Sequence, residues 1–279
     1  MKKVIVGNAN VSIFNNGELA IRLADIMNNQ SHWDPSYDEF VKTVRLFPSL
    51  TVHISLPGRA SIIVDPNDYF VSSPPGSEYA PTNYIPPPRI FDQLESSGIS
   101  LSNVTHVVIT HAHFDHYAGV TRKNANGIFQ PSFPNATYFL NQADWERSET
   151  QESLKNPSSE VSNSLGILHN ASVLRLITGK TELFPEVTIV PAPGETPGHQ
   201  ILRLNSGGET LYCLGDLFHD FVEVENPSAM ASWADFETNL HSKESLSKSA
   251  LREGALLIPA HMELGRLTTR ESRIKWEAA

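Results

Sequence analysis

Short runs of apolar residues, separated by turn-forming residues, recur along the chain. Segments 51–56 and 60–64 are rich in β-branched residues, and Pro57-Gly58 between them predicts a β-hairpin. Similar runs predict strands over residues 104–110, 136–140, 187–190, 201–204, 210–214 and 256–258. The strands therefore fall into two groups along the sequence.

Between the strands, apolar residues recur at the spacing of one helix face. This pattern predicts helices over residues 90–97, from near 115, over 142–153, over about 161–176 and over 236–253, with 243–248 as a solvated face. Two groups of strands, each followed by helices, favour a layered α/β domain over a helical bundle or a pure β-sandwich. The proline-rich stretch 72–88 lies between strong strand and helix signals, so we interpret it as a stiff surface loop rather than an interdomain linker.

The composition is that of a globular protein, and the net charge limits the classes of partner that it can bind. The chain has 279 residues, 40% of them hydrophobic and 19% charged, which is enough for one sizeable core. Its 31 acidic and 21 basic residues give a net charge of −10, and no basic run is present. Phosphate backbones and anionic lipids would be repelled. We therefore expect a small-molecule substrate and neither nucleic acid nor a membrane as partner.

Two further features bear on location and redox chemistry. The apolar run at residues 4–6 is too short for a signal peptide or a membrane span, which favours a cytoplasmic location. The single cysteine, Cys213, lies in the apolar run 211–214 and is expected to be a buried core residue.

The clearest chemical signal follows the predicted strand 104–110. Three histidines and an aspartate lie within six residues, from His111 to His116. In an extended segment residues two apart face the same way, so His111 and His113 can reach one point. Asp115 and His116 stand where a helix begins and can reach a second point. A helix-capping role for Asp115 would not explain this density of histidines, and the pattern predicts two metal ions.

Three more candidate ligands stand in similar settings downstream. His199 follows the turn 193–198, Asp216 follows an apolar run, and His261 follows Pro259-Ala260. Imidazoles and carboxylates without thiolate suit two Zn²⁺ ions, with Mn²⁺, Co²⁺ and Fe²⁺ as alternatives. Two such ions can share a hydroxide at neutral pH, which makes hydrolysis the expected chemistry.

These motifs resemble those of the metallo-β-lactamase superfamily. His111-Ala112-His113-Phe114-Asp115-His116 is similar to its HxHxDH signature, and Thr196-Pro197-Gly198-His199, Gly215-Asp216 and Pro259-Ala260-His261 are similar to its later ligand motifs. The resemblance covers about residues 50–265 and implies one α/β domain, a four-layered αββα sandwich with the metals at one edge of the two sheets. It also implies a ligand set, with His111, His113 and His199 on the first metal, Asp115, His116 and His261 on the second, and Asp216 bridging them.

Compared with a minimal member of this family, the chain has an N-terminal extension over residues 15–48. Its aromatic residues include Trp33, Tyr37 and Phe47. Aromatic side chains are enriched in both cores and interfaces. We expect them to pack onto the domain, or else to form a substrate lid or the arm of a homodimer.

Departures from the family pattern disfavour some branches of the superfamily. β-Lactamases of this fold place a cysteine among the second-metal ligands, whereas the corresponding strand here offers Asp216. Flavin-linked di-iron members use a glutamate where His113 stands. The remaining resemblance is to N-acyl homoserine lactone lactonases and methyl parathion hydrolase-like phosphotriesterases. Many lactonases have a tyrosine three residues after the bridging aspartate, and this chain has His219 there.

The sequence thus predicts a dinuclear metal-dependent hydrolase in which a bridging hydroxide attacks a lactone, ester or phosphotriester of a small molecule. Asp115 and His219 are the candidate catalytic residues. We expect His219 to assist the developing oxyanion or the leaving alkoxide rather than to bind metal. Two alternatives remain, a mononuclear iron oxygenase of the persulfide dioxygenase type and a non-catalytic metal-binding member of the fold.

Overall fold

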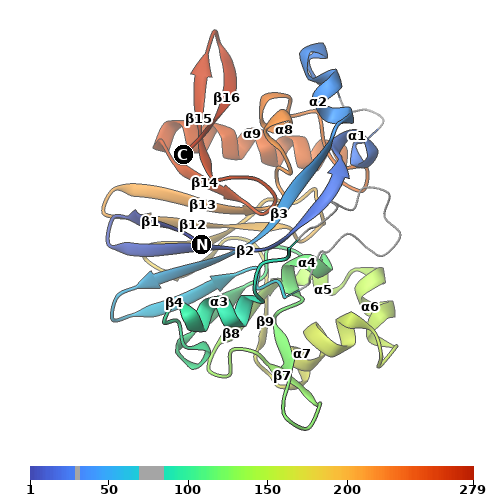
Figure 1. Ribbon diagram of the computed structural model, residues 1–279, viewed down its shortest axis with the longest axis vertical. Helices are drawn as coiled ribbons and strands as arrows, with labels where there is room; N and C mark the ends of the chain where they lie inside the picture. Colours follow the sequence, from blue (N-terminus) through green and yellow to red (C-terminus); the bar gives the residue numbers. More distant parts are fainter. Residues whose placement is uncertain (29–31, 69–84) are drawn as a thin grey trace.

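The computed structural model describes residues 1–28, 32–68 and 85–279, which form two face-to-face β-sheets with helices over both outer faces (Figure 1). The first sheet has the order β1-β2-β3-β4-β5-β8-β9. Its strands are β1 (Lys2–Val6), β2 (Ala9–Arg22), β3 (Val44–Leu56), β4 (Ala60–Val64), β5 (His106–Val108), β8 (Thr137–Asn141) and β9 (Leu174–Ile177). Neighbours from β1 to β4 are antiparallel, and those from β4 to β9 are parallel.

The second sheet contains the strands from β10 to β16 in sequence order. They are β10 (Thr181–Phe184), β11 (Val187–Pro191), β12 (Gln200–Ser206), β13 (Glu209–Gly215), β14 (Leu256–Pro259), β15 (Gly265–Arg270) and β16 (Arg273–Ala278). The pairing is antiparallel except between β13 and β14. A separate ribbon pairs β6 (Thr121–Lys123) with β7 (Phe129–Pro131).

Helices complete the outer layers. Against the first sheet lie α3 (Ile90–Ser96), α4 (Phe114–Tyr117), α5 (Gln142–Trp145), the π-helical turn Ser162–Gly166, α7 (Ile167–Asn170) and the 3₁₀ turn Leu101–Asn103. Helix α6 (Ser148–Leu154) packs beside α5 and the π-helical turn. Against the second lie α8 (Phe221–Glu225) and α9 (Phe236–Glu253). The N-terminal region adds α1 (Leu23–Ile26), the 3₁₀ turn Pro35–Tyr37 and α2 (Asp38–Lys42). In Figure 1, α3 and α9 lie on opposite sides of the sandwich.

Strand alternation divides the apolar residues among the layers. Ile62 and Val64 of β4 face the second sheet, whereas Ile63 between them faces the helices of the first. On β13, Cys213 lies in the core between the sheets and Leu214 lies under α9. Each central strand is therefore buried on both faces. This arrangement confirms the predicted αββα sandwich and the buried position of Cys213.

Most predicted elements are confirmed, and α9 has the predicted bounds. The side chain of Asp235 caps its first turn by accepting the Thr238 N–H. Gly254, at φ 57°, ends it in the left-handed conformation that favours glycine. The predicted hairpin is present as β3 and β4, although β3 begins seven residues earlier, at Val44 instead of residue 51.

Two helix predictions need correction. The segment 142–153 forms two short helices, because Arg147 adopts an extended conformation between them. The segment 161–176 is helical only to Asn170, since Ser172 has a φ of 58° and β9 begins at Leu174. The apolar residues at positions 173, 174, 176 and 177 fit the spacing of a helix and that of a strand, and pairing with β8 makes this segment a strand.

The N-terminal region 15–48 is built into the sandwich by long strands. β2 and β3 pair along their whole lengths, with a register shift between Asn15 and Glu18. Beyond that shift, Phe47, Trp33 and Tyr37 join an apolar cluster with Val222 of α8. This placement favours the packing interpretation of these aromatic residues. Within the described ranges, no helix is long and apolar enough to cross a membrane. Of the proline-rich stretch, residues 72–84 lie outside the described ranges, and 85–88 form no regular element.

Candidate metal centre

The first group of ligand candidates comes from the end of β5 and the turn after β11. His111 and His113 follow β5, and their facing nitrogens, Nε2 and Nδ1, are 2.9 Å apart. His111 Nε2 also lies 3.7 Å from Oδ2 of Asp216. His199 Nε2 is 3.2 Å from the backbone nitrogen of Asp216. His111 and His113 therefore form one ligand group with the carboxylate of Asp216, and His199 reaches the backbone of the same residue.

The second group surrounds the other oxygen of the same carboxylate. His116 Nε2 and His261 Nε2 each lie 3.2 Å from Oδ1 of Asp216. Asp115 Oδ2 lies 3.4 Å from His261 Nε2, and Asp115 Oδ1 lies 3.7 Å from His116 Nε2. All seven predicted ligands are thus brought together. Asp216 stands between the two groups, where a bridging residue would have to be.

Hydrogen bonds at the far ring nitrogens orient three of the histidines. Nδ1 of His199 lies 2.9 Å from the carbonyl oxygen of Ala192, and Nδ1 of His261 lies 2.8 Å from that of Pro48. Nδ1 of His116 lies 2.9 Å from Oδ2 of Asp65. A donor bond from Nδ1 leaves the Nε2 lone pair directed at the centre, which is the usual way metal-binding histidines are held.

A glycine and a buried carboxylate shape the backbone around the ligands. Gly215, at φ 52°, lets the chain pass close to His199, because a Cβ there would lie 2.9 Å from its Nε2. Asp144 accepts the Ala112 and Gly198 N–H groups, each at 2.7 Å. It thereby ties the loop carrying His111 to the loop carrying His199. Its sequence position at the start of a helix gave no signal of this role.

Burial and charge at the centre suit cations. Burial lowers the pKa of His199 to about 4, so this imidazole is neutral and able to bind a metal. Burial opposes the charge on Asp216, but His116 and His261 hold its pKa well below its usual range. Nε2 of His116 and Oδ1 of Asp216 are buried without a hydrogen-bond partner among the described residues. A buried carboxylate surrounded by imidazoles, with orphaned polar atoms beside it, fits a pair of divalent ions.

His219 lies beside the centre and belongs to a buried polar chain. Its Nε2 is 3.5 Å from Oδ2 of Asp216, and its Nδ1 is 3.0 Å from Oε1 of Glu223. Nζ of Lys243 donates to Oε2 of Glu223 at 2.6 Å. The prediction that 243–248 forms a solvated helix face is therefore wrong for Lys243, Leu246 and Ser247, which are buried. Lys243 is 1% exposed because its ammonium pairs with Glu223.

Sequence reasoning also missed Glu195, which is 3% exposed and lies within the turn that precedes His199. Its Oε1 lies 3.5 Å from Nδ1 of His113 and 3.8 Å from Nε2 of His219. The indole N–H of Trp233 donates to the same oxygen. The only sequence signal for this role of Glu195 is its place in the four residues before His199, where a carboxylate stands inside a glycine- and proline-rich turn next to a predicted ligand.

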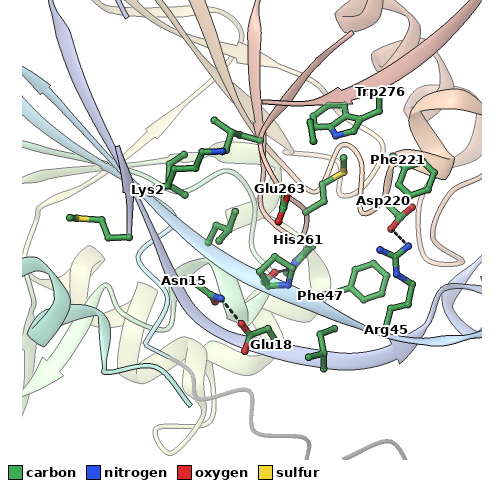
Figure 2. A pocket seen from close by; sticks show the side chains of 18 residues that line it. Lys2, Asn15, Glu18, Arg45, Phe47, Asp220, Phe221, His261, Glu263 and Trp276 are labelled. Carbon is green, nitrogen blue, oxygen red and sulfur yellow. Dashed lines mark hydrogen bonds and ion pairs between the residues drawn. The ribbon is translucent and has the colours of Figure 1, made fainter. Parts of the chain in front are cut away.

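A cavity of about 690 Å³ borders the second group of ligands. Figure 2 shows His261 on its wall, with Phe47 and Arg45 to one side and Trp276 across from them. Arg45 Nη1 lies 3.5 Å from Oδ2 of Asp220, also in the lining. The lining is thus mixed, with apolar rings and charged groups. A molecule bound there would lie beside His261.

Comparison with known proteins agrees with this geometry. The family model of the metallo-beta-lactamase superfamily matches residues 76–261, and the chain belongs to this superfamily. An N-acyl homoserine lactonase of Bacillus sp. is 27% identical over 176 residues, and one of Bacillus cereus is 25% identical over 174. Each match spans 62% of this chain and 62% of the relative. These matches confirm the predicted family and its lactonase-like branch.

Solved structures show the same fold over nearly the whole chain. The hydrolase AbOPH of the beta lactamase superfamily has a TM-score of 0.75 at 15% identity, covering 99% of this chain and 96% of that one. AidC, a dizinc quorum-quenching lactonase solved with a product, has a TM-score of 0.74 at 19% identity, covering 100% and 97%. At these identities the likeness establishes the fold.

Proposed function

We propose that the protein is a dinuclear metal-dependent hydrolase that opens a lactone, ester or phosphotriester of a small molecule. The observation that carries the proposal is the position of Asp216, whose Oδ2 lies near His111 and whose Oδ1 lies near His116 and His261. Two divalent ions held there would lower the pKa of a shared water toward about 7 and polarise the bond under attack. Zinc is the first candidate, because imidazole and carboxylate ligands suit it.

The residues divide into holding and assisting roles. His111, His113 and His199 would hold one ion, Asp115, His116 and His261 the other, and Asp216 both. His219 would assist the reaction, since its Nε2 is buried beside Asp216 and has no hydrogen-bond partner among the described residues. From that position a protonated imidazole can stabilise a developing oxyanion or protonate a leaving alkoxide.

Two observations bear on the substrate. The curated relatives are N-acyl homoserine lactonases, which favours a lactone. The cavity beside His261 combines aromatic walls with Arg45 and suits a small molecule having an apolar part and a polar part. Phosphotriesters are a second class, because the stretch Gly215-Asp216-Leu217-Phe218-His219 resembles that of methyl parathion hydrolase-like phosphotriesterases and both reactions require attack at an oxygen-ester centre.

Elemental analysis and a substrate panel test the proposal together. Protein purified without chelator should contain two metal ions per chain and turn over at least one of an N-acyl homoserine lactone, an aryl ester and an aryl phosphotriester. Asp216→Ala should lose both ions and at least about 100-fold in turnover, whereas His199→Ala should mainly weaken one ion. One iron per chain with oxygen consumption would identify an oxygenase instead. Two ions with no turnover across the panel would indicate a binding protein.

A further inference from the structure

Glu195 places an additional carboxylate oxygen among the first group of ligands. Ligand atoms of His111, His113, Glu195 and Asp216 all lie within 4.8 Å of one another. Oε1 of Glu195 is 3.5 Å from Nδ1 of His113, a separation close to the 3.7 Å between His111 Nε2 and Asp216 Oδ2. Glu195 thus stands at the spacing of residues that share one ion, although the seven predicted ligands do not include it.

The charge of Glu195 is surrounded by imidazoles rather than by Lys or Arg side chains. The side chain is almost fully buried, and no Lys or Arg forms an ion pair with it among the described residues. Its nearest polar neighbours are the Trp233 indole N–H and the imidazoles of His113 and His219. A buried carboxylate is costly unless it is paired or coordinates a metal. This carboxylate lies beside the imidazole of His219 and also faces the metal-binding group at His113.

We propose that Glu195 is a ligand of the first metal ion, in addition to His111, His113, His199 and Asp216. The inference rests on the proposed dinuclear centre. Five donors, two of them carboxylates, exceed the four that a tetrahedral Zn²⁺ site needs. Such a set favours an ion that accepts five or six ligands and oxygen donors, such as Mn²⁺, Fe²⁺ or Co²⁺. Compared with a site of three histidines and one aspartate, the first position should therefore be shifted in selectivity away from Zn²⁺ and toward these ions.

Metal titration and the absorption spectrum of the cobalt-loaded protein test this inference without relying on turnover. The wild-type protein should bind two Co²⁺ ions, with weak visible bands typical of five or six ligands. Glu195→Gln should raise one of the two Co²⁺ dissociation constants at least about tenfold and leave the other nearly unchanged. The visible bands should gain intensity because the ion loses a ligand. In competition, the variant should also shift toward Zn²⁺ relative to Mn²⁺.

Two further variants make the result specific. Glu253→Gln removes a carboxylate that bonds Tyr212 and Arg203, far from the ligand groups, and should leave both dissociation constants unchanged. Glu195→Asp keeps the charge but shortens the side chain. If the glutamine variant is unstable, the aspartate variant can be used to test ligation instead. Its affinity for one Co²⁺ should fall as well.

The outcomes separate this inference from the proposed function. Two bound ions with a spectrum and dissociation constants insensitive to both Glu195 substitutions would overturn the ligand assignment alone. A wild-type protein that takes up no Co²⁺ would overturn the dinuclear centre and the inference together. An equal loss of both ions in Glu195→Gln, with the same loss in Glu253→Gln, would indicate general destabilisation and also contradict the assignment.

Discussion

The two ring nitrogens of His219 have different partners. Nδ1 faces the carboxylate of Glu223 at 3.0 Å, whereas Nε2 points toward Asp216 and Glu195. Burial opposes protonation, but the carboxylates of Glu223 and Glu195 raise the pKa of His219 well above its usual value. The imidazole is therefore fixed in orientation and carries a proton toward the centre.

We accordingly predict that His219→Ala retains both metal ions while kcat falls by about 10² to 10⁴, the usual contribution of a positioned proton donor. His219→Tyr should recover part of the loss on lactones, because a phenol can also donate. Elemental analysis beside steady-state kinetics checks both statements. An alanine variant with two metals and wild-type kcat would remove His219 from the reaction.

Single residues also mark the limit of what the sequence could predict. The seven ligand candidates were recognisable because each stands at the end of a strand or turn, and four lie within six residues. Glu195 and Asp144 were not, because their roles depend on contacts made after folding. Asp144, for example, contacts Thr196, which lies 52 residues further along the chain. No periodicity or local spacing encodes such a contact.

At the scale of elements, a buried ion pair joins α8 to α9. Nζ of Lys243 donates to Oε2 of Glu223 and to the carbonyl oxygen of Ala229, at 2.6 and 2.8 Å. Both charged side chains are 1% exposed. Removing one partner leaves the other charge buried and unpaired, which is costly. The pair therefore fixes the position of α8 and, through Glu223, the ring of His219.

We predict that Lys243→Met lowers the free energy of unfolding by about 3–5 kcal/mol. The double variant Lys243→Met, Glu223→Leu should regain much of that stability, because no lone charge remains, but its kcat should stay low since His219 has lost its orienting partner. Lys248→Met on the same helix, where the lysine is exposed, should change stability by less than about 0.5 kcal/mol. Denaturant unfolding measures the stability of the three variants, and steady-state kinetics measures the kcat of the double variant. Wild-type stability in Lys243→Met would contradict the assigned role of the pair.

The elements themselves were predicted where their ends carry local signals. For α9, the capping residue Asp235 and the terminal Gly254 lie in the sequence directly before and after the apolar helical pattern. The edge strands β1 and β16 and the long β2 had no such signal. Their apolar faces are incomplete, and pairing with neighbours such as β3 and β15 determines them. Tertiary pairing thus overrode weak local preference.

At the scale of the whole molecule, the candidate centre joins the two halves of the sandwich. His111, His113, Asp115 and His116 follow β5 of the first sheet, whereas His199, Asp216 and His261 lie at the ends of strands in the second. Metal ions bound by both sets would connect the two sheets at one edge. The ligands are preformed only in the folded chain, so binding energy adds to folding stability.

Metal removal should therefore destabilise the fold as a whole. With free metal at about 100 times each dissociation constant, two independent sites contribute about 5 kcal/mol, which a chelator would abolish. We predict a Tm that falls on chelation by about 10 °C or more, returns on readdition of metal, and rises with metal concentration. Asp216→Ala, which has lost the residue common to both sites, should have a Tm insensitive to chelator. A wild-type Tm that does not respond to chelator, in protein shown to release its metals, would mean that the ions do not connect the two sheets.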